Sequence, residues 1–192
     1  MAPGGSGMSE ALWALGRGTG VVALITFTLS IVLGIMSRSG RSFGLGRFGV
    51  QEVHRTAALT GTGLVLAHLV SLFFDPYAQL TLLDSVVPFL GSYRPIFLGL
   101  GTVAIDLLLV VTLVSLLRDR VGPRVFRAVH WATYAFWPVA LVHSLGTGTD
   151  AGTWWFRAIA VACVGAVSGV VGWRLLPSYD ERGHARIPRQ VA

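Results

Sequence analysis

Five long apolar stretches dominate the sequence and limit what the chain can fold into. They cover approximately residues 11–36, 53–74, 95–117, 126–146 and 154–176. The segments between them are polar, rich in arginine or marked by glycine and proline. A bilayer core about 30 Å thick is crossed by roughly 20 apolar residues in a helix. The sequence therefore predicts an all-α integral membrane helical bundle of five transmembrane helices, with six as the alternative.

The composition supports a membrane protein and excludes several other classes. Only 12% of the residues are charged, against about 25% in a typical soluble domain. The single cysteine, Cys163, excludes an intramolecular disulfide, a cysteine zinc site and a CxxCH haem attachment. We expect a short outer tail over 1–10, a transmembrane domain over 11–176 and a cytoplasmic tail over 177–192.

The arginines are distributed unevenly between the two ends of the expected helices. All 15 basic residues are Arg, a composition typical of bacteria with GC-rich genomes, and 12 of them fall on the side of the C-terminal tail. Cytoplasmic segments carry the excess of Arg in membrane proteins. This predicts a multi-pass protein of the bacterial plasma membrane, with its N-terminus outside, its C-terminus in the cytoplasm and lipid around it. Topology thus explains the net charge of +6 without a nucleic-acid partner.

Four histidines lie inside the expected spans, where an ionisable ring is costly and marks a functional site. His54 and His68 belong to the second span, and His130 and His143 belong to the fourth. The spacings of 14 and 13 residues separate the rings of each span by about 21 and 19.5 Å along the helix axis. Because both spans run in the same direction, His54 shares a level with His130, and His68 shares a level with His143.

Two opposed histidine pairs suit the axial positions of two haem irons. Four ligands spread over about 20 Å cannot surround one zinc or copper ion. The sequence therefore predicts two haems, with one haem or no cofactor as the alternatives. The 13-residue spacing leaves His143 roughly 140° from His130 around an ideal helix, and a kink at Pro138 is expected to re-aim His143. His184, in the polar tail, is expected to be a solvated surface residue.

Short motifs accompany the four histidines: His54-Arg55, Leu66-Ala67-His68, Val129-His130-Trp131, Tyr134, Trp137-Pro138 and Leu141-Val142-His143. With these motifs and spacings, the sequence over about 45–176 resembles the ferric reductase-like transmembrane domain family. That family includes ferric reductases, NADPH oxidases and the membrane subunit of the bacterial methionine sulfoxide reductase system. The resemblance implies His54 and His130 as ligands of an inner haem, and His68 and His143 as ligands of an outer haem. It also implies electrons that enter at the inner haem and leave at the outer one.

The large members of this family continue into a cytosolic domain that binds flavin and nicotinamide. The sequence has no GxGxxG fingerprint followed by an acidic residue, so we expect no flavin or nicotinamide site in this chain. The expected function is that of an electron-transfer subunit of an oxidoreductase. Its donor would be a separate cytoplasmic flavoprotein or a quinol, and its outer acceptor ferric iron or a partner redox protein. The alternatives are a haem subunit dedicated to an exported reductase, similar to methionine sulfoxide reductase, and a haem-free scaffold or transporter subunit.

Several other residues are candidates for supporting roles. Arg55, Arg124 and Arg127 flank the inner level and are candidate partners of haem propionates through charge-assisted hydrogen bonds, with plain topology as the alternative. Asp106, in the middle of the third span, is expected to face protein or water. Trp137, between the two levels, is a candidate bridge for electron tunnelling, with core packing as the alternative.

Glycines and one loop complete the expectations. Gly61 and Gly63 lie between the histidines of the second span and are expected to allow close approach of a helix or a porphyrin. The loop over 75–94 is unusually apolar and is expected to cover the outer site. Arg94 and Asp150 are expected to lie near the mouth of that site.

Overall fold

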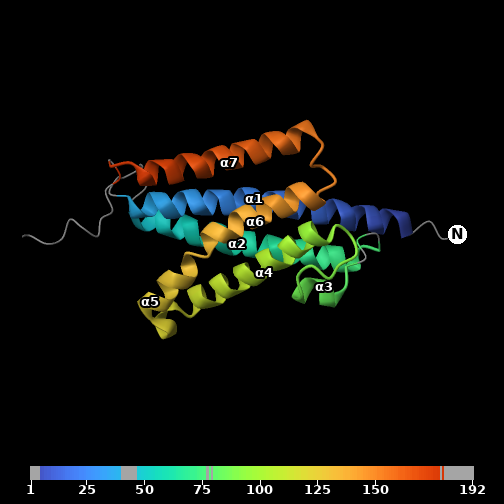
Figure 1. The fold of residues 1–192 in the computed structure, drawn as a ribbon, viewed down its shortest axis with the longest axis horizontal. Coiled ribbons are helices and arrows are strands. Elements are labelled where there is room, and N and C mark those ends of the chain that lie inside the picture. The colour runs from blue at the N-terminus through green and yellow to red at the C-terminus, as the bar shows by residue number, and fades with distance from the viewer. Residues whose placement is uncertain (1–4, 40–46, 77, 79, 178, 180–192) are drawn as a thin grey trace, which may run out of the picture.

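The computed structural model of the chain describes all residues except 1–4, 40–46, 77, 79, 178 and 180–192. The described residues form an all-α bundle, as predicted (Figure 1). Its helices are α1 (Gly5–Arg38), α2 (Arg47–Phe74), α3 (Leu82–Val86), α4 (Pro95–Leu116), α5 (Arg118–His130), α6 (Thr133–Thr147) and α7 (Trp154–Leu175).

Four helices of the described chain, α1, α2, α4 and α7, are long and apolar enough to cross a bilayer. They coincide with four of the five predicted spans, so the chain is a multi-pass membrane protein in contact with lipid. With 34 residues, α1 is roughly 51 Å long at 1.5 Å per residue, which exceeds the hydrocarbon core. The segment expected as a tail over 1–10 is helical from Gly5 onward, because each added helical residue gains one backbone hydrogen bond.

The prediction of one continuous span over 126–146 is wrong, because the chain changes its hydrogen bonding between α5 and α6. Trp131 and Ala132 keep helical dihedrals with ψ of −23° and −17°. The N–H groups of Ala132, Tyr134 and Ala135 donate to carbonyls three residues back, which is the pattern of a 3₁₀-helix. Pro138 has no N–H to offer the Tyr134 carbonyl, so the α-helical ladder is weakened at this turn.

The tight turn changes how His143 is oriented relative to His130. A 3₁₀-helix has 3.0 residues per turn against 3.6 in an α-helix, so each tightened residue adds about 20° of rotation. Several such residues recover roughly half of the 140° by which an ideal α-helix would separate the two rings. The expected kink at Pro138 is therefore corrected: the irregularity lies over 131–135, about one turn earlier.

A second irregularity divides α5 itself. Gly122 has φ 79° and ψ 163°, a left-handed conformation that only glycine adopts at little cost. Pro123 follows and begins the second half of α5, as expected for a proline at a helix start. In Figure 1, α5 lies at the edge of the bundle, below the plane of α1 and α7. We call this end of the molecule, with Arg55 and the four arginines of α5, the arginine-rich end.

The helices pack in two antiparallel pairs held together by α1. Helix α2 packs along α1, α6 packs along α4, and α1 also contacts α6 and α7 (Figure 1). Helix α2, which carries His54 and His68, is not closely packed on α5 or α6, which carry His130 and His143, in the described part of the chain. The core therefore comes from α1, α4, α6 and α7. Its buried residues are Ala23, Leu24, Phe27, Ala104, Leu108, Phe136, Trp137, Leu141, Ala160 and Cys163.

Asp106 does not pack inside the bundle. Its side chain is exposed on the outer surface of α4, near the middle of the helix. The neighbouring core positions Ala104 and Leu108 point inward, so Asp106 lies on the opposite face. Of the two surroundings expected for Asp106, protein within this chain is therefore excluded.

The apolar segment over 75–94 folds onto the first turns of α4. Thr81 caps α3, since its hydroxyl accepts from the Asp84 N–H at 3.2 Å and donates to the Asp84 carboxylate at 2.6 Å. These bonds hold the pKa of Asp84 below its usual value. The Asp84 carbonyl in turn accepts from the Thr102 hydroxyl at 2.7 Å, and the Phe89 ring lies against Gly99. The segment thus covers the end of α4 that contacts His143, which is described below.

An ion pair fastens the connection between α6 and α7 to α1. The Arg17 guanidinium donates to both carboxylate oxygens of Asp150, with Nε at 2.5 Å from Oδ2. The two side chains are 30% and 12% exposed, so water screens this pair only in part. Arg17 also lies 3.9 Å from the centroid of the Trp13 ring. Of the two residues expected near the outer mouth, Asp150 therefore binds Arg17, and Arg94 donates to the Gly146 carbonyl.

We expect Arg17→Ala and Asp150→Ala to be strongly non-additive. Breaking a partly buried pair should lower the free energy of unfolding by about 1–3 kcal/mol, between the ranges for exposed and buried pairs. A double-mutant cycle on detergent-induced unfolding measures the coupling. Arg118 and Asp119 are the control, because this pair is 3.6 Å apart and 68% and 91% exposed. Simple additivity at Arg17 and Asp150 would contradict the expectation.

Candidate functional site

The four membrane histidines form two pairs, one toward each end of the bundle. The first pair is His54 on α2 and His130 at the end of α5, with ring centroids 6.2 Å apart and ring planes at 76°. The second pair is His68 on α2 and His143 on α6, toward the other end of the bundle. The structure thus brings His54 and His130 together, although α2 and α5 are not among the closely packed helix pairs of the described residues.

Three of these histidines use the same hydrogen bond to a neighbouring helix. The His54 Nδ1 lies 2.7 Å from the Ser30 carbonyl of α1, and the His68 Nδ1 lies 2.7 Å from the Gly16 carbonyl of α1. The third bond joins the His143 Nδ1 to a carbonyl of α4, that of Phe97, at 2.8 Å. A carbonyl only accepts, so in each case Nδ1 carries the proton and donates it. The three rings are therefore fixed in the tautomer that leaves Nε2 with a free lone pair.

A glycine four residues beyond each carbonyl makes room for the ring. A Cβ built on Gly34 would lie 3.2 Å from the His54 Cε1, and one on Gly20 would lie 3.2 Å from the His68 Cε1. On Gly101 it would lie only 2.5 Å from the His143 Cε1. We call this combination, a carbonyl that accepts from Nδ1 and a glycine one helical turn later, the carbonyl–glycine cradle.

The glycines singled out from the sequence are not those that contact the histidines. A Cβ on Gly61 would meet the Phe27 ring at 2.9 Å, so this glycine serves helix packing, and Gly63 has nothing within 4 Å. The cradle glycines of α1 do leave a signal in the sequence. Gly20 and Gly34 are separated by 14 residues, the same interval that separates the two histidines of α2.

His130 has no cradle. Its Nδ1 is buried and has no hydrogen-bond partner in the described part of the chain. The ring stacks instead on Phe126, one turn earlier in α5, with centroids 5.2 Å apart and planes at 24°. His130 is also the last residue of α5, directly before the tight turn. The first pair is therefore built asymmetrically, with one ring fixed by α1 and the other held by stacking.

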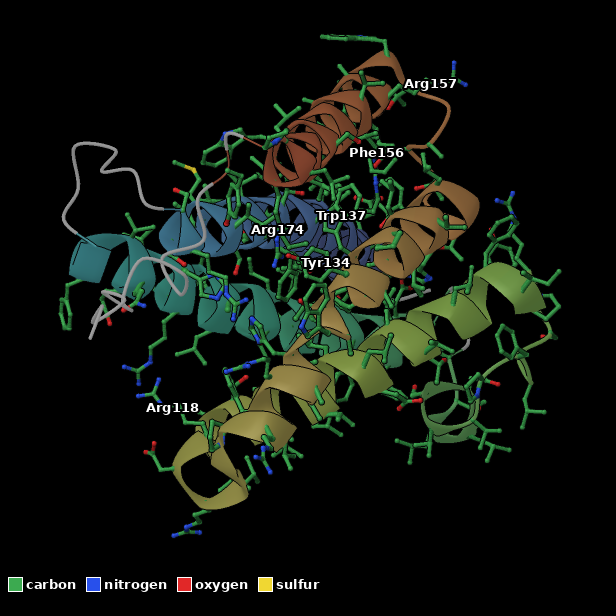
Figure 2. All side chains as sticks on the ribbon, turned by 60° about the vertical axis from the view of Figure 1, so that its left-hand side comes forward. Arg118, Tyr134, Trp137, Phe156, Arg157 and Arg174 are labelled. Atoms are coloured by element: carbon green, nitrogen blue, oxygen red, sulfur yellow. The ribbon has the colours of Figure 1, made fainter. Side chains whose placement is uncertain are left out.

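Arginine and aromatic side chains surround the first pair. Arg55, Arg124 and Arg127 are exposed and lie on α2 and α5, the same helices as His54 and His130. Their role as partners of an anion stays a prediction. Figure 2 shows Arg174 of α7 reaching toward Tyr134 of α6, and its guanidinium donates to the Tyr134 hydroxyl at 2.5 Å. Arg174 also lies 5.1 Å from the centroid of the Trp131 ring, so α7 braces the tight turn.

Trp137 lies in the core on α6 (Figure 2), between His130 and His143 along the chain. Its indole N–H donates to the Thr28 hydroxyl of α1 at 2.9 Å, and Thr28 donates in turn to the Leu24 carbonyl. The indole is thus satisfied and buried at 7% exposure. This arrangement gives Trp137 a packing role that joins α6 to α1.

The donor set fits a metal that receives most of its ligands from a bound cofactor. Among the described residues, no group of three or more His, Cys, Asp or Glu side chains could hold a metal ion. Two imidazoles that bind one ion from opposite sides, each at about 2.0 Å, have ring centres roughly 6 Å apart. The 6.2 Å of the first pair agrees with that arrangement. A haem, which supplies four ring nitrogens of its own and takes two axial histidines, matches these residues.

One protein family matches most of the chain. The family described as ferric reductase like transmembrane component covers residues 19–141. The chain belongs to this family. The matched region includes most of α1 and all of α2, α4 and α5, so it starts earlier than the expected resemblance over 45–176. It contains three of the four membrane histidines and ends just before His143. Membership in the ferric reductase-like family indicates electron transfer in the membrane.

No curated protein and no solved structure matches the chain.

Proposed function

We propose that this ferric reductase-like protein is a di-haem b-type cytochrome that carries electrons across the bacterial plasma membrane. The carbonyl–glycine cradle is the observation that carries the proposal. At three of the four histidines it fixes the Nδ1–H tautomer, which presents Nε2 as a metal ligand. A polar ring in a membrane helix that serves only packing does not need this repeated orientation.

The residues of the chain would perform distinct tasks in this function. His54 and His130 would hold one haem at the arginine-rich end, and His68 and His143 the other at the opposite end. The haem iron supplies one-electron redox chemistry. With two histidines holding each haem, electrons would enter and leave through the haem edges. The low-dielectric core around Trp137 would exclude water between the two levels.

The asymmetry of the arginines supports a direction for this transfer. By the positive-inside rule, the arginine-rich end faces the cytoplasm, with the N-terminus outside. Arg55, Arg124 and Arg127 would bind the haem propionates there. The donor would be a separate cytoplasmic flavoprotein or a quinol, and the outer acceptor ferric iron or a partner redox protein. The chain would then be the electron-transfer subunit of an oxidoreductase.

A haem assay on the purified protein and on His68→Ala tests the proposal. We expect a b-type reduced-minus-oxidised spectrum and about two haems per chain, falling to about one in His68→Ala. His184→Ala is the control, since this histidine lies outside the described residues in the polar tail, and it should retain both haems. Wild-type protein without haem would contradict the proposal and favour a scaffold or transporter subunit.

A further inference from the structure

Three of the four membrane histidines have a hydrogen-bond partner for Nδ1 within the described chain, and His130 does not. His54, His68 and His143 each donate from Nδ1 to a helix carbonyl at 2.7–2.8 Å. His130 keeps a buried Nδ1 without a partner among the described residues. Stacking on Phe126 is its main support, and stacking does not select which of the two ring nitrogens carries the proton.

The backbone at His130 is also less constrained than at the other three. His54 and His68 lie in the interior of α2, and His143 lies in the last turns of α6, within a continuous helix. His130 ends α5, and Ala132 begins the turn with three-residue hydrogen bonds. The Thr133 hydroxyl donates to the His130 carbonyl at 2.7 Å, so a side chain takes the place of a regular helix bond. Both the side chain and the backbone of His130 are therefore less constrained than those of the other three histidines.

Hydrogen bonds of this kind determine how firmly a histidine holds a metal. A partner on the second ring nitrogen fixes the tautomer, orients the ring and raises its basicity as a ligand. Loss of such a partner typically lowers metal affinity by about 10–100-fold. The second pair has the bond on both sides, whereas the first pair has it only at His54. The two levels should therefore differ in how readily one axial ligand is exchanged.

We infer that His130 is the exchangeable ligand, so that the arginine-rich end is a binding site for a small neutral ligand such as carbon monoxide or free imidazole. Such a ligand would take the axial position of His130, while the bond to His54 stays intact. The second pair would exclude the same ligand, because both of its rings are cradled. The part of this inference that involves iron rests on the proposed function, whereas the unfixed tautomer of the His130 ring does not.

The first test needs no haem. Nitrogen-15 NMR of histidine-labelled, haem-free protein in lipid nanodiscs reports the tautomer of each ring, assigned with single His→Gln variants. We expect the Nδ1–H tautomer alone at His54, His68 and His143, and a mixture of tautomers at His130. A single fixed tautomer at His130 would overturn the inference whether or not the protein binds haem.

The second test uses the haem-loaded protein. Carbon monoxide added after reduction with dithionite should change the spectrum of about half of the haem. Binding to neither haem, or equally to both, would overturn the inference while leaving the di-haem proposal intact. The matched variant is Gly20→Ala, which places a Cβ 3.2 Å from the His68 ring and should make the second level reactive as well. Gly18→Ala, with nothing within 4 Å on the same helix, should bind carbon monoxide as the wild type does.

Discussion

Replacing Gly101 by alanine is expected to displace the His143 imidazole and to remove the haem of the second pair. The added Cβ would lie 2.5 Å from Cε1 and 2.6 Å from Nδ1 of the ring. Atoms that are not linked through covalent bonds do not come this close, so the ring must move. The ring cannot retreat without losing its 2.8 Å bond to the Phe97 carbonyl. We expect the haem content to fall from about two per chain to about one, measured by absorption against protein concentration.

The control for this variant is Gly63→Ala on α2, where a Cβ meets nothing within 4 Å. Both substitutions replace a helical glycine and gain about 1 kcal/mol of helix propensity. A difference between them therefore reports the contact with the ring and not the change in backbone freedom. If Gly101→Ala retained both haems, the cradle would not be needed to hold His143.

Trp137→Ala is expected to be the most destabilising single substitution in the core. The side chain is 7% exposed and belongs to the cluster that joins α1, α4, α6 and α7. Truncating a buried tryptophan costs about 3–5 kcal/mol, and here it also removes the bond to Thr28. The free energy of unfolding, measured by titration with denaturing detergent in mixed micelles, should fall by that amount.

Two further variants separate packing from hydrogen bonding at this position. Thr28→Val leaves the indole N–H buried without an acceptor and should cost about 1–3 kcal/mol. Trp154 is 82% exposed on α7, so Trp154→Ala should change the unfolding free energy by less than about 0.5 kcal/mol. Equal losses in Trp137→Ala and Trp154→Ala would show that the core cluster does not stabilise the bundle.

Hydropathy predicted the helices well where one helix crosses the membrane without interruption. The stretches that became α1, α2, α4 and α7 are uniformly apolar and long enough to span. The stretch over 126–146 is less apolar, since it contains Arg127, His130 and His143, and the chain switches to three-residue hydrogen bonds at Ala132. Hydropathy records which side chains are apolar and not which carbonyl each N–H reaches. Pro138 marked the disturbance, but its missing N–H acts on the preceding turn.

The site was predictable to the extent that it depends on side-chain type and spacing. Four histidines at intervals of 14 and 13 residues predict two levels, and the structure brings His54 and His130 together at one of them. The cradles were not predicted, because their acceptors are backbone carbonyls and every residue has one. For a related reason, Asp106 could be assigned a depth but no single surrounding. Its depth in the membrane follows from the sequence, whereas the face it occupies depends on how α4 packs.

Both cradles of α2 are formed by a single helix, and this has a mechanical consequence. The acceptors on α1 are the carbonyls of Gly16 and Ser30. The distance between these two carbonyls along α1 therefore determines where the two histidine rings of the antiparallel helix α2 can be held. Sliding α1 past α2 by one residue would move both acceptors by about 1.5 Å and turn them by about 100°. Neither ring can be repositioned by such a movement without the other. The two levels are therefore kept in register as a unit, and any evolutionary insertion between the two acceptors would need a compensating one in α2.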